Sequence, residues 1–231
     1  MNLRYTVLMM PAFLIGCASL PSLDGRTESR YLDTPSSPRL EASLKLAHKK
    51  QPADSDSDTS DVYLLNDAHD AFVARAELID AADHTLDIQY YIWHNDISGK
   101  LLFNLVHRAA ERGVRVRLLL DDNNTDGLDN ILLALDSHPN IEIRLFNPFV
   151  SRRWRALGYL TDFPRLNRRM HNKSLTADNR ATIVGGRNIG DEYFKVGEDT
   201  IFADLDILAT GRVVTEVSQD FDRYWASHSA Y

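Results

Sequence analysis

Apolar residues recur along the chain from Val62 onward with two spacings that alternate. An apolar residue at every third or fourth position predicts helices over 67–82, 98–113 and 128–135. Runs rich in β-branched and aromatic residues predict strands between these helices and after them. The predicted strands cover 85–93, 114–120, 141–146, 170–177, 182–184 and 201–209.

One further helix is predicted near the C-terminus. It has a single apolar stripe, made of Val214, Val217, Phe221, Tyr224 and Trp225. Strands that alternate with helices favour a sheet covered by helices. We therefore expect an α/β domain over 61–231, with a mixed β-sheet sandwiched between helices and a turn at 178–180 joining two strands.

The first 60 residues differ in composition from the rest of the chain and lack its regular apolar spacing. Residues 5–15 are mostly apolar and follow one positive charge, but this stretch is shorter than the roughly 20 residues that a membrane-spanning helix needs. It predicts a signal peptide over 1–16. Residues 17–60 are polar, contain four prolines and end in an alternating Asp–Ser run. We expect a flexible tether there, with a short helix around 40–49.

The end of the predicted signal peptide, Leu14-Ile15-Gly16-Cys17, resembles a bacterial lipobox, in which the cysteine becomes lipidated. The alternative is a plain signal peptide with an unrelated cysteine. Cys17 is the only cysteine, which excludes an intrachain disulfide and a cysteine zinc site. A lipid anchor implies the cell envelope of a bacterium. Ala18, in place of an aspartate, favours the outer membrane over the inner, facing the periplasm.

The clearest candidate chemistry is His171-Asn172-Lys173 followed by Asp178, a pattern written HxKxxxxD. Residues two apart on a strand share a face, so an imidazole and an ammonium project together. A neutral imidazole can attack phosphorus while a cation holds the non-bridging oxygens. We expect Asp178 to orient His171, as the aspartate of a serine-protease triad orients its histidine.

A second element of the candidate site is Gly185-Gly186-Arg187-Asn188, at the close of the following strand. Gly185 and Gly186 are expected to let the backbone approach a phosphate closely. Asn188 can donate from its amide to a phosphoryl oxygen, although a purely structural role remains an alternative for it.

The segments 169–178 and 184–194 together resemble the phospholipase D superfamily, and within it the bacterial cardiolipin synthase branch. Segments 116–122, 204–211 and 221–225 are similar to that branch as well. The resemblance covers 62–228, with Gly185-Gly186 where family members usually carry Gly-Ser. It implies phosphatidyl transfer or phospholipid phosphodiester cleavage through a phosphohistidine intermediate, with catalytic His171, Lys173 and Asp178 and without cofactor or metal.

Members of this branch carry two such motifs in a longer chain, whereas this chain carries one. In the family, one histidine attacks phosphorus and the other protonates the leaving alcohol. We therefore expect the first half only of such a domain, completed by a homodimer or by a second half-domain. The alternatives are a homodimeric single-motif phosphodiesterase or nuclease, and an inactive truncated half-enzyme. The net charge of -7 argues against non-specific nucleic-acid binding, and the leading hypothesis involves a phospholipid substrate.

Other polar clusters leave two interpretations open. Six arginines between 152 and 169, interleaved with aromatic residues, predict either a surface for anionic head groups or a set of ion pairs. Asp121 and Asp122 end a strand and favour a turn over a metal site. Tyr90, Tyr91 and Trp93 are expected in the core.

Overall fold

The computed structural model describes residues 19–34, 36–48, 59–197 and 202–231. The strands of its sheet are β1 (Ser60–Leu65), β2 (Thr85–Tyr90), β3 (Arg115–Asp121), β4 (Ile141–Phe146), β5 (Ser174–Ala177), β6 (Ala181–Gly185) and β7 (Asp206–Gly211). The α-helices are α1 (Pro38–His48), α2 (Ala68–Ala81), α3 (Ile97–Glu111), α4 (Asp129–Asp136), α5 (Arg155–Thr161), α6 (Phe163–Leu166), α7 (Asp191–Phe194) and α8 (Arg212–Trp225). Short 3₁₀ turns occupy Asp122–Asn124 and Arg152–Trp154.

The sheet is mixed, which confirms the predicted fold class. Its strand order is β1-β7-β6-β5-β2-β3-β4, with β2, β3 and β4 parallel and the remaining pairs antiparallel. The parallel strands are connected through α3 and α4, because a parallel crossover needs a helix to return the chain. β5 and β6 instead form a hairpin, whose turn residues Asp178 and Asn179 have φ of 53° and 51°. Aspartate and asparagine tolerate this left-handed backbone better than most residues.

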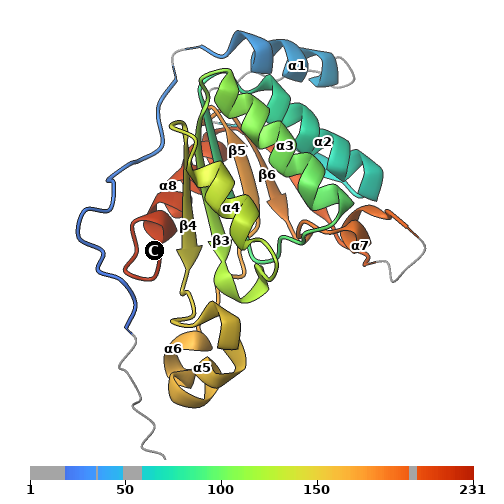
Figure 1. Ribbon diagram of the computed structural model, residues 1–231. Coiled ribbons are helices and arrows are strands. Elements are labelled where there is room, and N and C mark those ends of the chain that lie inside the picture. Colours follow the sequence, from blue (N-terminus) through green and yellow to red (C-terminus); the bar gives the residue numbers. More distant parts are fainter. Residues whose placement is uncertain (1–18, 35, 49–58, 198–201) are drawn as a thin grey trace, which may run out of the picture.

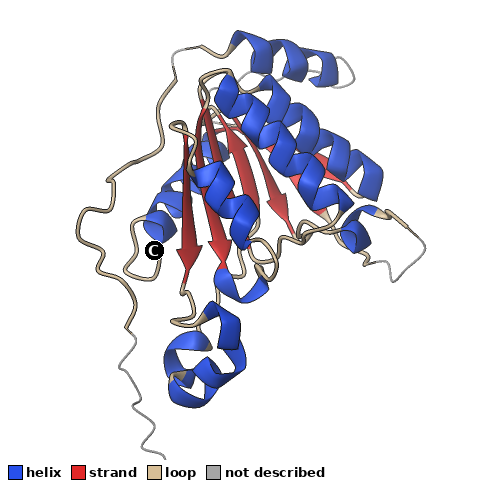
Figure 2. Ribbon diagram, in the orientation of Figure 1, coloured by secondary structure: helices blue, strands red, loops and turns tan. Residues whose placement is uncertain are grey.

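Helices cover both faces of the sheet (Figures 1 and 2). α2, α3 and α4 lie on one face, over a core that includes Ile88, Leu118 and Leu175. α8 crosses the other face and contacts β2, β5, β6 and β7. Its Phe221 and Trp225 form a second cluster with Leu119. The two clusters contain alternate residues of β3, as a strand buried on both faces requires.

Several predicted boundaries were wrong. The strand expected over 170–177 begins at Ser174, so His171 and Lys173 lie in the extended segment that enters β5. The strand expected over 201–209 runs from Asp206 to Gly211. β1 was not predicted, and neither were the short helices α5, α6 and α7. All four elements are short. The three helices lack the three or four turns over which an apolar stripe becomes visible in a sequence.

The segment 19–34, which we expected to be a flexible tether, is held against the domain instead. Arg26 donates from Nη1 to the backbone oxygens of Ser227 and Ala230 and from Nη2 to that of Ala226, at 2.6–2.9 Å. Further along, the backbone N–H of Tyr31 donates to Asp222 on α8. The helix expected near 40–49 is confirmed as α1, which packs on α2. This stretch is polar because it bonds to polar backbone at the domain surface.

The predicted signal peptide, the lipobox with Cys17 and most of the acidic run at 54–60 lie outside the described residues. Among the helices that the structure does describe, none has both the length and the apolar character required to cross a bilayer.

Candidate active site

Three chain segments meet at one end of the sheet and bring the candidate catalytic groups together. Because β5 is antiparallel to β2, with Ser174 opposite Gln89, the residues that enter β5 lie beside those that leave β2. The segment after β6 joins them through a bridge between Trp93 and Ile189. The residues at 171–173, 91–93 and 186–189 therefore become neighbours, although they are far apart in the sequence.

His171 and Lys173 form the centre of this site, as the spacing predicted. Nζ of Lys173 lies 3.2 Å from Nδ1 of His171, 3.4 Å from Nε2 and 2.8 Å from the backbone oxygen of the same residue. The His171 ring is exposed, whereas Lys173 is buried. Desolvation lowers the pKa of His171, and the charge of Lys173 lowers it further. Both effects favour the neutral imidazole, which is the form that can act as a nucleophile.

Tyr91 also belongs to the site, although we expected it in the core. Its ring centroid lies 4.7 Å from that of His171, and Nζ of Lys173 lies 5.3 Å from the same ring. Tyr90 and Trp93 are buried as predicted. The alternation of side chains along a strand was the available signal, because Tyr90 and Tyr91 must point to opposite faces.

Asp204 is a site residue that sequence reasoning missed. Its negative charge raises the pKa of both His171 and Lys173, against the larger lowering by desolvation. The carboxylate lies directly over Gly186, where an added Cβ would come within 1.7 Å of Oδ1. Asp204 precedes β7, so only the pairing of β7 with β6 brings it to the site. No local motif in the sequence could have indicated this.

Asn188 lies at the site but is already engaged in hydrogen bonds. Its Oδ1 accepts from the backbone N–H of Ile92 at 3.0 Å, and its Nδ2 donates to the hydroxyl of Tyr193 at 3.0 Å. Both Asn188 and Tyr193 are buried. Burial raises the pKa of Tyr193, so that hydroxyl stays protonated. An amide nitrogen has two hydrogens, and the bond to Tyr193 uses one N–H of Asn188.

Gly185 and Gly186 lie against the chain that enters β7. A Cβ on Gly185 would come within 2.5 Å of Cα of Asp206 and of the backbone oxygen of Leu205. The N–H of Gly186 donates to the same Leu205 oxygen at 3.0 Å. These glycines therefore make room for the chain at 204–206, and their expected approach to a phosphate stays a prediction.

The expectation that Asp178 orients His171 was wrong. Its side chain is fully buried, and Oδ1 accepts from the backbone N–H of His84 and of Thr85, each at 2.7 Å. Oδ2 accepts from the N–H of Asp83 at 2.9 Å. Since Asp178 follows the last residue of β5, it lies at the opposite end of that strand from His171. Its carboxylate fixes the start of β2 and the hairpin turn, and it does not contact His171.

A buried cluster of charged residues lies where β6 ends and β7 begins. Oδ2 of Asp206 lies 2.9 Å from Nη2 of Arg75 and 3.2 Å from Nη1 of Arg187. Arg75 also donates from Nε to the hydroxyl of Tyr90 at 3.0 Å. Because Arg187 follows the two glycines and Asp206 begins β7, this cluster fixes the spacing between the two segments that carry Asn188 and Asp204.

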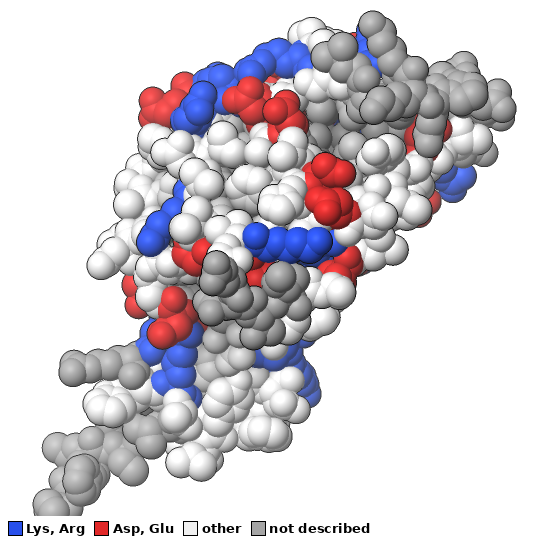
Figure 3. All heavy atoms as spheres, turned by 90° about the vertical axis from the view of Figure 1, so that its right-hand side faces the viewer, with Lys and Arg blue, Asp and Glu red and all other residues white. Residues whose placement is uncertain are grey.

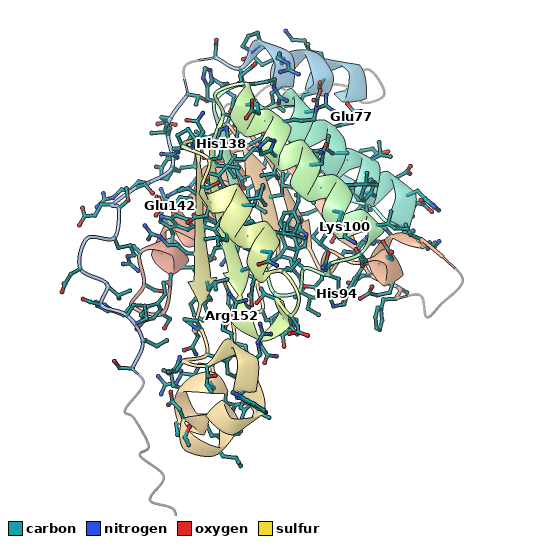
Figure 4. All side chains as sticks on the ribbon, in the orientation of Figure 1. Glu77, His94, Lys100, His138, Glu142 and Arg152 are labelled. Carbon is teal, nitrogen blue, oxygen red and sulfur yellow. The ribbon has the colours of Figure 1, made fainter. Side chains whose placement is uncertain are left out.

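Most of the arginines between 152 and 169 form ion pairs and hydrogen bonds within the domain, in keeping with the ion-pair interpretation. Arg169 donates to Asp121 at 2.9 Å, and Arg152 forms an ion pair with Asp122 at 3.2 Å. Figure 4 shows Arg152 between the sheet and the helices α5 and α6. Asp121 also accepts from the backbone N–H of Met170, which positions the approach to His171. Both aspartates thus bind arginine side chains and backbone N–H groups. This fits a turn at Asp121 and Asp122 better than a metal site.

One group in the described part of the chain has the composition of a metal site. His94, Asp96 and Glu192 offer ligand atoms that lie within 4.8 Å of one another. Asp96 already accepts from the backbone N–H of Gly99 and of Asp191, which cap α3 and α7. Glu192 lies 3.2 Å from Nδ1 of His94. These contacts give the cluster a structural role, because they link the segment before α3 to the start of α7.

A hollow of about 290 Å³ adjoins the candidate site on the side of α8. Its walls on the sheet side include the polar residues Gln89, Lys173 and Ser174 together with Val184. α8 contributes Val213, Val217, Glu216 and Asp220, so apolar and acidic side chains share that wall.

Comparison with known proteins relates this geometry to a family. The family model described as cardiolipin synthase, PLD-like domain, matches residues 76–225. Cardiolipin synthase C of Escherichia coli is 63% identical over 164 residues, which are 71% of this chain and 35% of that protein. Cardiolipin synthase A of Pseudomonas entomophila is 30% identical over 171 residues, 73% of this chain and 34% of that protein. The chain thus spans about a third of the length of these relatives.

Solved structures share the fold at low sequence identity. NucT from Helicobacter pylori has a TM-score of 0.55 at 14% identity, and the match covers 74% of this chain and 97% of that one. Nuc from Salmonella typhimurium, titled a phospholipase D family member, has a TM-score of 0.53 at 16% identity over 75% of this chain and 99% of that one. These matches show the fold, while the family model and the identity to Cardiolipin synthase C show that the chain belongs to the phospholipase D-like cardiolipin synthase family.

Proposed function

We propose that this chain supplies one half of an active site that transfers a phosphatidyl group or cleaves a phospholipid phosphodiester bond through a phosphohistidine at His171. The observation that carries the proposal is the ammonium of Lys173 against the His171 ring, with the pKa of that ring lowered. A nucleophile and a cation are then presented together to a phosphodiester.

In the first step, a neutral nitrogen of His171 attacks phosphorus. An N–P bond forms, the bond from phosphorus to the leaving alcohol breaks, and Lys173 stabilises the charge on the non-bridging oxygens. The remaining N–H of Asn188 can donate to one of these oxygens. Asp204 stabilises the positive charge that develops on the ring, which is the role we had expected for Asp178.

The leaving alcohol must take a proton, and an acceptor alcohol or water must later lose one. We infer that a second histidine provides this proton transfer. It comes either from a second copy of this chain or from a second half-domain. The length of the curated relatives, of which this chain spans about a third, leaves room for a second half-domain in the complete protein.

A phospholipid substrate is favoured by the identity to Cardiolipin synthase C, which is 63% over 164 residues of this chain. We also propose lipidation at Cys17 after removal of residues 1–16, which would anchor the chain in the bacterial envelope, on the periplasmic side of the outer membrane. The attachment of Arg26 to the residues after α8 supports a short connection between that anchor and the domain.

A second candidate is a single-motif phosphodiesterase that works as a homodimer. The specific observation in its favour is that the fold match covers 97% and 99% of two whole chains, so a domain of this size can be a whole protein. The net charge of -7 and the identity to cardiolipin synthases make a nucleic-acid substrate the weaker choice.

The experiment is lipid turnover by the purified full chain in vesicles of phosphatidylglycerol, followed by chromatography of the products, with DNA as a parallel substrate. We expect His171→Ala to reduce turnover by about a thousandfold or more. His69→Ala, at an exposed position on α2, is the matched control and should retain full activity. Turnover that survives His171→Ala would overturn the proposal, and cleavage of DNA alone would establish the second candidate.

A further inference from the structure

Residues 150–166, which comprise the 3₁₀ turn Arg152–Trp154 and the helices α5 and α6, project from the end of the sheet at which the candidate site opens (Figure 1). They lie between β4 and the segment that enters β5, so the chain leaves this projection directly toward His171. The first described residues of the N-terminal segment lie at the same end of the molecule. The projection is therefore close to His171 in sequence, and it shares one end of the molecule with these first described residues.

The inner side of the projection is packed against the body. Phe149 and Leu166 are buried, and a Cβ on Gly158 would come within 3.1 Å of both. The hydroxyl of Tyr159 donates to Asn123 at 2.7 Å. With the ion pairs from Arg152 and Arg169 described above, these contacts hold α5 and α6 in a fixed position.

The outer side of the projection is apolar. Its exposed fractions are 82% for Leu160, 60% for Trp154, 55% for Phe163 and 42% for Val150. A group of large apolar side chains on a projection whose inner side is already packed indicates a surface that meets an apolar partner.

Charge at the base of the projection indicates the chemistry of that partner. Residues 151–170 contain six arginines and one acidic residue, Asp162, in a chain whose net charge is -7. Figure 3 shows basic side chains where the projection joins the body, and mostly uncharged residues over the projection itself. An apolar tip above a cationic base matches a bilayer with anionic head groups, where aromatic and apolar side chains enter the interface and arginines remain at head-group level.

We propose that α5 and α6 form a membrane-contact element that inserts Trp154, Leu160 and Phe163 into the surface of an anionic bilayer. This inference rests on the proposed lipid substrate, since contact there would bring the opening beside His171 to the level of the head groups.

Trp154 provides a direct probe, because Trp93 and Trp225, which complete the three tryptophans of the chain, are buried. The full chain is reconstituted in vesicles of phosphatidylglycerol and phosphatidylcholine whose acyl chains carry bromine, which quenches indole emission on contact. We expect strong quenching in the native chain and roughly twofold or greater loss of it in Leu160→Asp. Trp154→Phe identifies the signal, since the buried tryptophans should remain unquenched.

Leu133→Asp is the matched control, because Leu133 is 72% exposed on α4, away from the projection. This variant should be quenched like the native chain. Vesicles of phosphatidylcholine alone should give weaker quenching, since the exposed Arg168 then meets no anionic head group. Absence of Trp154 quenching would overturn the proposal, and so would equal quenching with and without phosphatidylglycerol. A blue-shifted, unquenched Trp154 would indicate that protein covers this surface.

The same preparations separate this inference from the proposed function. His171→Ala should abolish lipid turnover while leaving Trp154 quenching intact. Leu160→Asp should leave turnover of a soluble short-chain phospholipid unchanged and reduce turnover in vesicles. Turnover that depends on His171 without any quenching would refute the membrane-contact element alone.

Discussion

Nζ of Lys173 lies 3.2 Å from Nδ1 of His171 and 2.8 Å from the backbone oxygen of the same residue. An ammonium can donate to a ring nitrogen only if that nitrogen carries a lone pair, so an ammonium at this position favours the neutral imidazole. Desolvation, reinforced by the charge of Lys173, lowers the pKa of His171 in agreement with this geometry.

The pKa of His171 should therefore respond in opposite directions to two substitutions. Lys173→Met removes a positive charge, so the pKa of His171 should rise. Asp204→Asn removes a negative charge that favours the imidazolium, so the pKa should fall further. Titration of the histidine ring protons by NMR measures both shifts, and the resonances of the other histidines serve as the control. A pKa of His171 that is the same in both variants would refute this assignment of neighbours.

The low pKa of His171 also predicts the pH dependence of the covalent step. Because the neutral ring is the nucleophile, the rate should be constant above the pKa of His171 and fall as the pH drops through it. That fall should lie at lower pH than for an ordinary histidine, and Asp204→Asn should move it lower still. Single-turnover rates measured across pH test this order.

Asp178 should behave as a structural residue. Asp178→Asn replaces a buried carboxylate that accepts three backbone N–H groups, and we expect it to lower the free energy of unfolding by about 3 kcal/mol. Activity per folded molecule should be largely retained, because Asp178 does not contact His171. Urea unfolding together with turnover at low temperature separates the two effects. A stable but inactive Asp178→Asn would restore the orienting role that we first expected.

The two adjacent glycines should respond differently to the same small change. A Cβ on Gly185 would meet backbone atoms of 205–206, so Gly185→Ala should destabilise the domain by roughly 2 kcal/mol or more. A Cβ on Gly186 would meet only the end of the Asp204 side chain, which can move. Gly186→Ala should therefore leave stability nearly unchanged but displace Asp204, and the pKa of His171 should fall as it does in Asp204→Asn.

Most of the fold could be predicted from sequence, because it rests on local periodicity. The long helices α2, α3 and α8 have apolar stripes of three or four turns, and the buried strand β3 contains the apolar run Leu118–Leu120. The extent of β7 could not be predicted in the same way. It is determined by pairing with β1 and β6, which no local pattern reveals.

In the candidate site too, sequence predicted the neighbours that are close along the chain and missed those that strand pairing brings together. His171 and Lys173 are two residues apart, so their common direction follows from the geometry of an extended chain. Asp204 and Tyr91 reach the site through strand pairing, and sequence spacing gave no indication of the former. Asp178 was assigned to the site because it completes the HxKxxxxD motif, yet the four residues of β5 place it at the far end of the strand.

The attachment of the N-terminal segment is open to a separate test. Arg26→Ala removes donors to three carbonyl oxygens after α8, so we expect a loss of roughly 1–2 kcal/mol in stability. Hydrogen exchange should become faster at the end of α8 and in 226–231. The exposed Arg223→Ala, which loses only a surface ion pair with Asp220, is the matched control and should change neither quantity appreciably.

The most direct measurement concerns the covalent intermediate itself. A phosphatidyl ester of p-nitrophenol needs no proton on its leaving group, so a half-site with a nucleophile but without the second histidine can still react once. We predict a burst of nitrophenol equal to the amount of chain, and a phosphatidyl group on His171 in the alkali-quenched peptide, detected by mass spectrometry. His171→Ala should give neither signal, and His69→Ala should give both. Absence of the burst and of the adduct from the folded native chain would contradict the assignment of His171 as nucleophile.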